Sequence, residues 1–267
     1  MNVACNSLVA RNPLARRVWQ AKRFEPSHIP GLGLDLDAAY GVLNTIGPDV
    51  PATNGQAVRR WLDKSGNGRH FDQATATSQP VLKDGYIYAD GVNDQMFGNS
   101  SSLNLVSGVG AATVFCVAYR LGSLSATQVP MRVSVASSVA TRFGVETSVG
   151  LGRVSGRTVD TDAFRYADTP DGLSAAQPFI FYGHADFVLG TLSARLNGGS
   201  SGNGALVSSG LTPASLSSVV SLFSNGASLS NFYGGLARVL VWPRALTASE
   251  LLRVHRYLSA TYGIPLA

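Results

Sequence analysis

Three side chains suited to ligand binding lie two residues apart in the segment 182–186. Tyr182, His184 and Asp186 alternate with smaller residues, so in a β-strand they would share one face. A tyrosine ring can pack on the apolar face of a sugar, and the other two side chains can hydrogen-bond its hydroxyls. The spacing therefore marks a candidate glycan-binding face. The alternative is a solvated sheet face whose histidine is satisfied within the protein.

The sequence lacks catalytic motifs. Its only three glutamates, Glu25, Glu146 and Glu250, are widely separated. Asp160 and Asp162 would share a strand face, but they border a predicted loop and have no third acidic partner. There is no Gly-x-Ser-x-Gly, P-loop or His-Glu-x-x-His motif, and the other histidines are not at metal-ligand spacing. We therefore expect a protein that is not an enzyme.

Alternating apolar patterns predict the strands that would carry these side chains. The predicted strands are residues 112–119, 143–149, 179–189 and 236–242. Turns rich in Gly, Ser and Asn lie between them. The first of these segments is apolar on both faces, which is typical of a central strand in a packed sandwich.

A helix is predicted over residues 245–262. Thr247 is its expected N-cap, Glu250 completes a capping box three residues later, and Gly263 ends it. Leu251, Val254, Tyr257 and Leu258 form its apolar stripe.

Composition agrees with a globular β protein. The chain has 267 residues, of which 45% are hydrophobic, 14% are charged and 29 are glycine. These values exclude a disordered chain and favour one domain with many turns. The longest nearly apolar run is far shorter than the roughly 20 residues of a membrane-spanning helix. Its two cysteines fit neither a disulfide framework nor a zinc site, and we expect no secretory signal.

The first 30 residues carry most of the net charge of +5, with five basic side chains against one acidic one. Asn12 and Pro13 predict the start of a short amphipathic helix, followed by a Pro/Gly-rich linker. The residues expected to bind a partner are Leu14, Arg16, Arg17, Val18, Trp19, Lys22 and Arg23. One short helix cannot bury its own apolar stripe. We therefore expect this arm to dock on a partner protein; packing on its own body, or on DNA or a membrane surface, is the alternative.

Two segments carry a family resemblance. The first includes Trp61 and the turn "DKSGNG" at residues 63–68, followed by "DGVND" at residues 90–94. The second, "FYGGLARVLVWPRALTASELLRVHRYLSATYGIP", covers residues 232–265. Together they resemble the concanavalin A-like (laminin-G-like) jelly-roll domains of bacterial surface proteins and bacteriophage virion proteins. The resemblance spans roughly residues 30–267.

The resemblance implies an all-β fold, an antiparallel β-sandwich jelly roll over residues 31–267, with an N-terminal helical arm and linker over residues 1–30 and a C-terminal helix. It also makes calcium an option, with ligands from Asp63, Asn67, Asp90, Asn93 and Asp94 if the two turns meet; plain turn chemistry is the alternative. Glycosidases of this fold need paired carboxylates on one strand face. This chain has no pair of glutamates on one strand and no Glu-x-Asp-x-Glu pattern, so we expect no cofactor other than calcium and no hydrolysis.

The functional setting also comes from the resemblance. It implies a bacteriophage virion structural protein, assembled in the host cytoplasm and located in the virion. One version is a tail, baseplate or fibre component, anchored by its arm and able to contact host glycans. The alternatives are a capsid decoration or head-spike protein, and a carbohydrate-binding lectin or glycan-processing enzyme. We expect a homo-oligomer, with a trimer as the first expectation, and neither a nucleic-acid partner nor membrane insertion.

Overall fold

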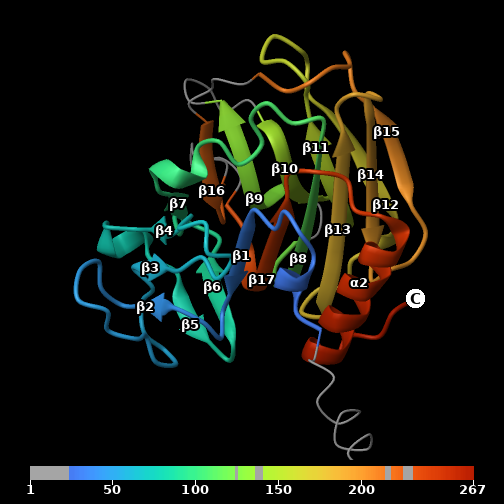
Figure 1. The fold of residues 1–267 in the computed structure, drawn as a ribbon. Helices are drawn as coiled ribbons and strands as arrows, with labels where there is room; N and C mark the ends of the chain where they lie inside the picture. The colour runs from blue at the N-terminus through green and yellow to red at the C-terminus, as the bar shows by residue number, and fades with distance from the viewer. Residues whose placement is uncertain (1–23, 124–125, 136–140, 214–217, 225–230) are drawn as a thin grey trace, which may run out of the picture.

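The structure is a computed structural model, and it describes residues 24–123, 126–135, 141–213, 218–224 and 231–267. The predicted helix of the arm lies outside these residues. The described chain forms two antiparallel sheets packed face to face, with one long α-helix on the outside (Figure 1). This is the β-sandwich with a C-terminal helix that the sequence predicts.

The first sheet has eight strands in the described chain. Their order is β15 (Gly202–Ala205), β14 (Thr191–Leu196), β13 (Pro178–Asp186), β8 (Ala111–Arg120), β17 (Tyr233–Trp242), β6 (Tyr86–Asp90) and β5 (Val81–Lys83), and β1 (Leu34–Asp37) also pairs with β17. The long central strands include three of the four predicted from alternation. The last strand in the chain thus lies in the middle of the sheet.

The second sheet has nine strands in the described chain. Their order is β12 (Arg165–Gly172), β11 (Leu151–Gly156), β10 (Thr141–Ser148), β9 (Gln128–Val135), β16 (Ser218–Leu222), β7 (Met96–Gly98), β4 (Phe71–Asp72), β3 (Arg60–Trp61) and β2 (Val42–Leu43). Short 3₁₀ turns, η2 (Pro26–His28), η3 (Ala76–Ser78) and η4 (Ser100–Ser102), join some of the elements. The predicted strand at residues 143–149 is β10.

Strand β8 shows why both faces of the first sheet are apolar. Val114 and Cys116 point into the core between the two sheets, whereas Phe115 and Val117 point outward into a second apolar cluster. Helix α2 (Ala248–Tyr262) covers this outer face. Burying one face against a sheet and the other against a helix favours a continuous apolar strand.

Helix α2 has the ends that the sequence predicts. The Thr247 side chain accepts a hydrogen bond from the Glu250 backbone N–H, and the Glu250 carboxylate accepts one from the Thr247 N–H. Gly263 ends the helix at φ 66°, a left-handed conformation that favours glycine. Val254 and Leu258 are buried against the outer face of the first sheet.

Residues 25–33, which the sequence predicts to be a linker, pack on the body. Ile29 is buried in the cluster beneath α2, and its carbonyl accepts a hydrogen bond from the Trp242 indole at 3.4 Å. The Arg244 guanidinium donates to the Pro30 carbonyl. The proline and glycine content correctly indicates irregular backbone, but these tertiary contacts hold it in place.

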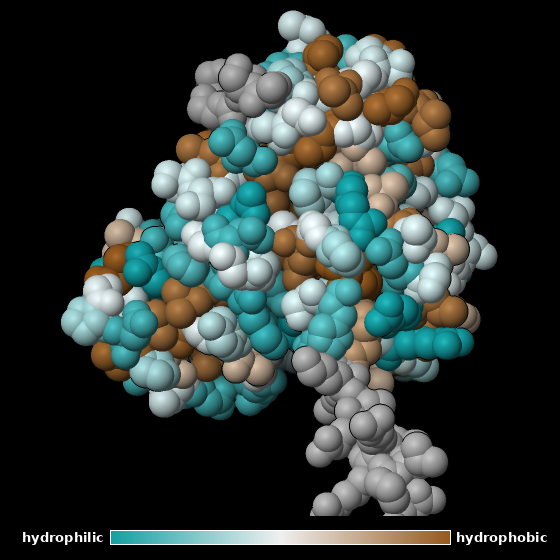
Figure 2. Space-filling view, viewed as in Figure 1, coloured by the Kyte–Doolittle hydropathy of each residue, from teal (hydrophilic) through white to brown (hydrophobic). Residues whose placement is uncertain are grey.

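Much of the visible surface is polar, with apolar patches at the upper end and on the lower left lobe (Figure 2). The most exposed large apolar side chains include Leu189, Val149 and Val92. No helix within the described ranges is long and apolar enough to span a membrane.

Candidate functional site

A buried cluster of charged side chains connects the first and last strands of the sandwich. In β1, Leu34 and Leu36 point into the core, so Asp35 and Asp37 point to the opposite face. Strand β17 pairs with β1 and brings Arg238 opposite Asp37. The Arg238 guanidinium donates to Asp35 Oδ2 at 2.8 Å and also to Asp37.

The cluster is buried but balanced in charge. Arg238 is 1% exposed and lies between the two carboxylates, which raise the pKa of its guanidinium. Burial raises the pKa of Asp35 to about 6, although Arg238 opposes this effect. Lys64 also reaches Asp37, with 3.3 Å between Nζ and Oδ2. A buried arginine with two aspartates forms a rigid polar floor, because each group holds the others in place.

An open cleft of about 450 Å³ lies beside this floor. The rings of Tyr86, Tyr257 and Tyr262 line it, from β6 and the C-terminal part of α2. Asp37 and Arg238 also line the cleft. We call this feature the tyrosine cleft.

The tyrosine rings are held in place by their neighbours. Tyr86 packs edge-on against Tyr119 with 4.8 Å between ring centroids. The Tyr257 hydroxyl donates to Glu25 Oε2 at 2.9 Å. Burial raises the pKa of Tyr86 and of Tyr262, so both remain protonated at neutral pH.

The arrangement can bind a flat, partly apolar ligand with several hydroxyls. Aromatic rings offer stacking surface, and pockets of this size commonly combine aromatic walls with a few fixed polar groups. Asp84, exposed in the β5–β6 turn, and Thr261, exposed on α2, add polar groups to the rim.

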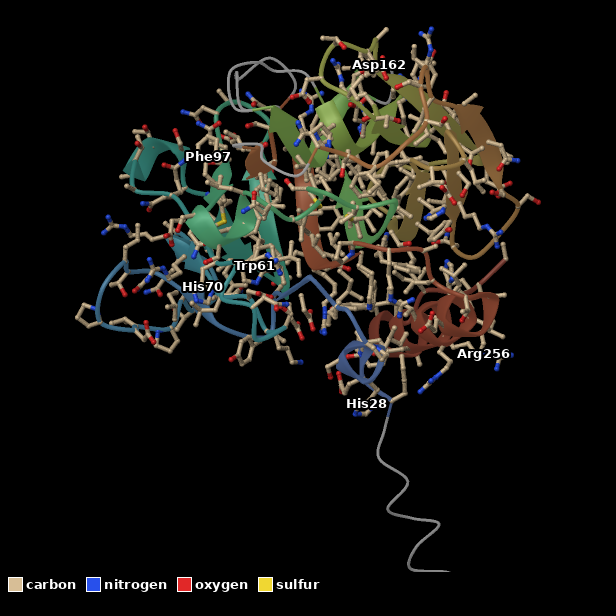
Figure 3. The ribbon with its side chains drawn as sticks, turned by 45° about the horizontal axis from the view of Figure 1, so that its top comes forward. His28, Trp61, His70, Phe97, Asp162 and Arg256 are labelled. Carbon is tan, nitrogen blue, oxygen red and sulfur yellow. The ribbon has the colours of Figure 1, made fainter. Side chains whose placement is uncertain are left out.

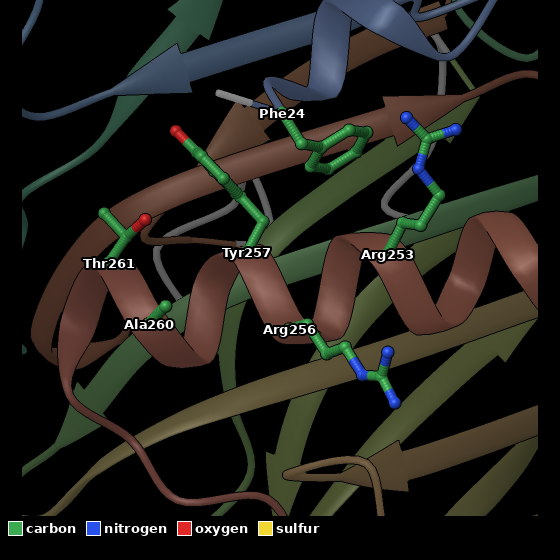
Figure 4. A pocket seen from close by; sticks show the side chains of 6 residues that line it. All are labelled: Phe24, Arg253, Arg256, Tyr257, Ala260 and Thr261. Atoms are coloured by element: carbon green, nitrogen blue, oxygen red, sulfur yellow. The ribbon is translucent and has the colours of Figure 1, made fainter. Parts of the chain in front are cut away.

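A second hollow, of about 320 Å³, lies on the outer side of α2 (Figure 4). Its lining residues are Phe24, Arg253, Arg256, Tyr257, Ala260 and Thr261. Phe24 packs under the Arg253 guanidinium, 4.5 Å from its central carbon. Neither arginine forms a salt bridge with a residue that the structure describes. Because Phe24 directly follows the arm, the arm joins the body at this basic and aromatic surface.

In the structure, Tyr182 of the predicted glycan-binding face is buried, whereas His184 and Asp186 are partly exposed. Tyr182, His184 and Asp186 do share the outer face of β13, but Tyr182 is 4% exposed and lies in the cluster beneath α2. His184 Nδ1 is 3.1 Å from the Ala112 carbonyl oxygen, and burial lowers the pKa of this histidine. Asp186 accepts a hydrogen bond from the Leu189 N–H in the following turn. The strand alternation places the three side chains on one face, but it does not reveal that α2 covers Tyr182.

The structure shows turn chemistry at both predicted calcium-binding turns. Asp63 accepts backbone N–H groups from Asp35, Ser65 and Arg69. Asn67 donates to the Leu32 carbonyl at 2.9 Å. These bonds tie the first turn to β1 and to the chain that precedes it.

The second turn is closed in the same way. Asp90 Oδ1 accepts the Val92 N–H and more weakly that of Asn93, and Asp94 Oδ2 accepts the Asp90 N–H at 2.9 Å. Among the described residues, no three acidic, histidine or cysteine side chains come close enough together to hold a metal ion. The five predicted ligands therefore do not form one group.

The isolated acidic residues also have structural partners. Glu146 is 3% exposed and accepts hydrogen bonds from Arg132 and Ser155. Asp160 pairs with Arg142, and Asp162 accepts a bond from the Ser208 hydroxyl. Asp162 lies at the opposite end of the molecule from His28 and Arg256 (Figure 3).

The tyrosine cleft was missed from the sequence. Tyr257 belongs to the apolar stripe of the predicted helix, and nothing near Tyr86 indicates a site. One signal was present: Leu34-Asp35-Leu36-Asp37 alternates apolar and acidic residues in a predicted β protein. Acidic residues on one face of a strand need either solvent or cationic partners.

Comparison with protein-family models and with curated protein sequences gives no match. Solved structures do match. Trypanosoma rangeli sialidase in complex with 2,3-difluorosialic acid has a TM-score of 0.58 at 10% identity, over 87% of this chain and 33% of that chain. The binding domain of botulinum neurotoxin DC in complex with rat synaptotagmin II has a TM-score of 0.57 at 8% identity, over 88% of this chain and 52% of that chain. The same toxin domain in complex with SialylT has a TM-score of 0.54 at 6% identity, over 88% of this chain and 52% of that chain.

This chain therefore spans between a third and about half of the length of these proteins. At such low identity the likeness shows the fold alone. It agrees with the antiparallel β-sandwich that the sequence motifs imply.

Proposed function

We propose that this protein is a non-enzymatic carbohydrate-binding β-sandwich, and that the tyrosine cleft is its binding site. The observation that carries the proposal is the meeting of three tyrosine rings with the Asp37–Arg238 floor in one open cleft. A sugar would pack an apolar ring face on Tyr86 or Tyr262 while its hydroxyls meet the rim and the floor. The fold comparisons are compatible with this, since two of the solved proteins that contain this fold in part of their chain are complexes with 2,3-difluorosialic acid and with SialylT.

The test is binding to an array of bacterial capsular and lipopolysaccharide fractions, followed by titration of the best fraction. Tyr86→Ala should weaken binding about tenfold, because an aromatic contact contributes about 1 kcal/mol beyond its buried area. Tyr86→Phe keeps the ring and should change binding less than threefold. Tyr166→Ala, which removes a half-exposed tyrosine from the second sheet, is the control.

Equal binding by the wild type and Tyr86→Ala would contradict the proposed site. Absence of any bound fraction would contradict the proposed function. Release of reducing ends from the same fractions, lost in Glu146→Ala or Asp160→Ala, would show that the protein is an enzyme after all.

We further propose that the protein is a bacteriophage virion component held by its arm. Two features support this setting: the motif resemblance, and the basic, aromatic surface at which the arm joins the body. Arg253 and Arg256 extend the positive charge of the arm onto α2, next to Phe24 (Figure 4). A partner with an acidic surface would contact both, with charge contributing to orientation and association rate. A tail, baseplate or fibre position and a capsid position remain alternatives.

A further inference from the structure

A third pocket, of about 330 Å³, lies on the other side of α2, between its N-terminal half and β14. Its lining residues are Arg195, Gly198, Ala248, Leu251, Leu252, His255, Leu266 and Ala267. Figure 1 shows the C-terminus beside α2. The hydrogen bond from the Ala267 N–H to the Asn197 carbonyl, at 2.9 Å, closes one side of the pocket.

His255 has one nitrogen without a partner. The residue is 5% exposed, and its Nδ1 is 3.0 Å from the Leu251 carbonyl oxygen, which can only accept a hydrogen bond. Nδ1 therefore carries the proton, and burial keeps the ring neutral by lowering its pKa. Nε2 is left as a lone-pair acceptor with no donor among the residues that the structure describes. A buried acceptor without a donor costs free energy, so something outside the described chain is expected to donate to it.

His255 is one of the residues that line the pocket, and its Nε2 is itself buried. A Cβ atom built on Gly198 would lie 3.6 Å from His255 Cδ2, the carbon bonded to Nε2. The ring itself is fixed, because Phe115 packs edge-on against it at 4.9 Å and Tyr182 lies at 6.0 Å. The position of Nε2 is thus set before any ligand arrives.

Arg195 gives the same pocket a positive charge. Its guanidinium lies 5.7 Å from the Tyr182 ring centroid and forms no salt bridge with any described carboxylate. Its Nε is also buried without an acceptor. Leu251, Leu252 and Leu266 make the rest of the wall apolar.

We propose that this pocket binds an acidic sugar, whose carboxylate pairs with Arg195 and whose hydroxyl donates to His255 Nε2. The two unpaired groups differ in what they require: Arg195 requires an anionic acceptor, and His255 requires a neutral donor. A sugar acid presents both within one ring, and the leucines can cover its apolar face. The proposal takes carbohydrate binding as its starting point but names a site separate from the tyrosine cleft.

The test is NMR titration of the full chain with glucuronic acid, N-acetylneuraminic acid and, as the neutral match, glucose. The ¹⁵N resonance of His255 Nε2 reports directly on a donated hydrogen bond. An acidic sugar should move this resonance in the wild type, and glucose should move it at least tenfold less at equal concentration. Arg195→Gln should weaken binding of the acid at least tenfold, and Tyr166→Ala, on the second sheet, should leave it unchanged.

His255→Phe keeps the ring and removes the acceptor, so it should abolish binding while leaving the melting temperature unchanged or higher. If His255→Phe fails to fold, the Arg195→Gln titration still tests whether the pocket binds an acidic sugar. A resonance that no acidic sugar moves would show that only water fills the pocket and would overturn the proposal. Equal binding of glucose would overturn it too. Loss of binding in Tyr86→Ala alone would place the sugar in the tyrosine cleft instead.

Discussion

Arg238 illustrates how the same type of ion pair differs in energy between the interior and the surface. Its guanidinium is almost fully buried and compensates two buried carboxylates, Asp35 and Asp37. Arg60 makes a similar two-point contact with Asp72, but both side chains are about a quarter exposed. Burial, rather than geometry, therefore distinguishes the two pairs.

We predict that Arg238→Gln lowers the free energy of unfolding by about 3–5 kcal/mol, because two buried carboxylates lose their partner. Arg60→Gln should lower it by less than about 1 kcal/mol, since Asp72 remains solvated. Urea denaturation at pH 7 measures both values. Similar losses in the two variants would mean that the Asp35–Asp37 floor is not held by Arg238.

At the scale of elements, helix α2 divides the outer face of the first sheet into separate sites. The tyrosine cleft lies at the C-terminal end of α2. The hollow lined by Phe24 lies on its outer side, and the pocket lined by His255 lies beside its N-terminal half. The stability of this one helix therefore affects all three.

Substitution of the N-cap of α2 tests how much the cap contributes to the stability of the protein. Thr247→Ala should lower the free energy of unfolding by about 1 kcal/mol, because it removes the side-chain acceptor of the Glu250 N–H. Ser249→Ala removes a hydroxyl from an exposed position one residue into the helix and is the matched control. Thermal or chemical denaturation of both variants measures the difference. An equal effect of the two substitutions would show that the cap contributes nothing specific.

The sequence predicts those helices and strands whose capping residues or apolar alternation lie within one short segment. The caps of α2 and the alternation in β8, β13 and β17 lie within single segments, so they could be read directly. The tyrosine cleft could not, because Asp37, Tyr86 and Tyr257 come from three distant parts of the chain. Local alternation also placed Tyr182 on the correct strand face while leaving open what covers that face.

At the scale of the whole molecule, the beginning of the folded body decides how the arm can be removed. The sequence predicts a domain that begins at residue 31, but Ile29 is 1% exposed and lies in the apolar cluster beneath α2. Cutting the chain at residue 24 or at residue 31 should therefore have different effects.

We predict that a chain lacking residues 1–23 keeps the melting temperature of the full protein but no longer joins assembled particles. For a chain lacking residues 1–30, the free energy of unfolding should fall by about 2 kcal/mol or more. The reason is that burial of Ile29 alone contributes about 1.5–3 kcal/mol to it. Calorimetry and co-purification with particles measure the two effects. Normal incorporation of the shorter truncation would show that the body, and not the arm, holds the partner.

The central place of β17 also has a consequence for the order of synthesis. Strands β1, β6 and β8 all pair with β17, and Asp35 is 203 residues from the arginine that compensates it. A ribosome adding about 5–20 residues per second needs roughly 10–40 s to make that stretch. During this time β1 and β6 have unpaired edges, and Asp35 and Asp37 lack the Arg238 guanidinium that compensates their charge. The nascent chain must therefore remain unassembled until its last 35 or so residues emerge, and any early stop before Trp242 yields a chain prone to aggregation.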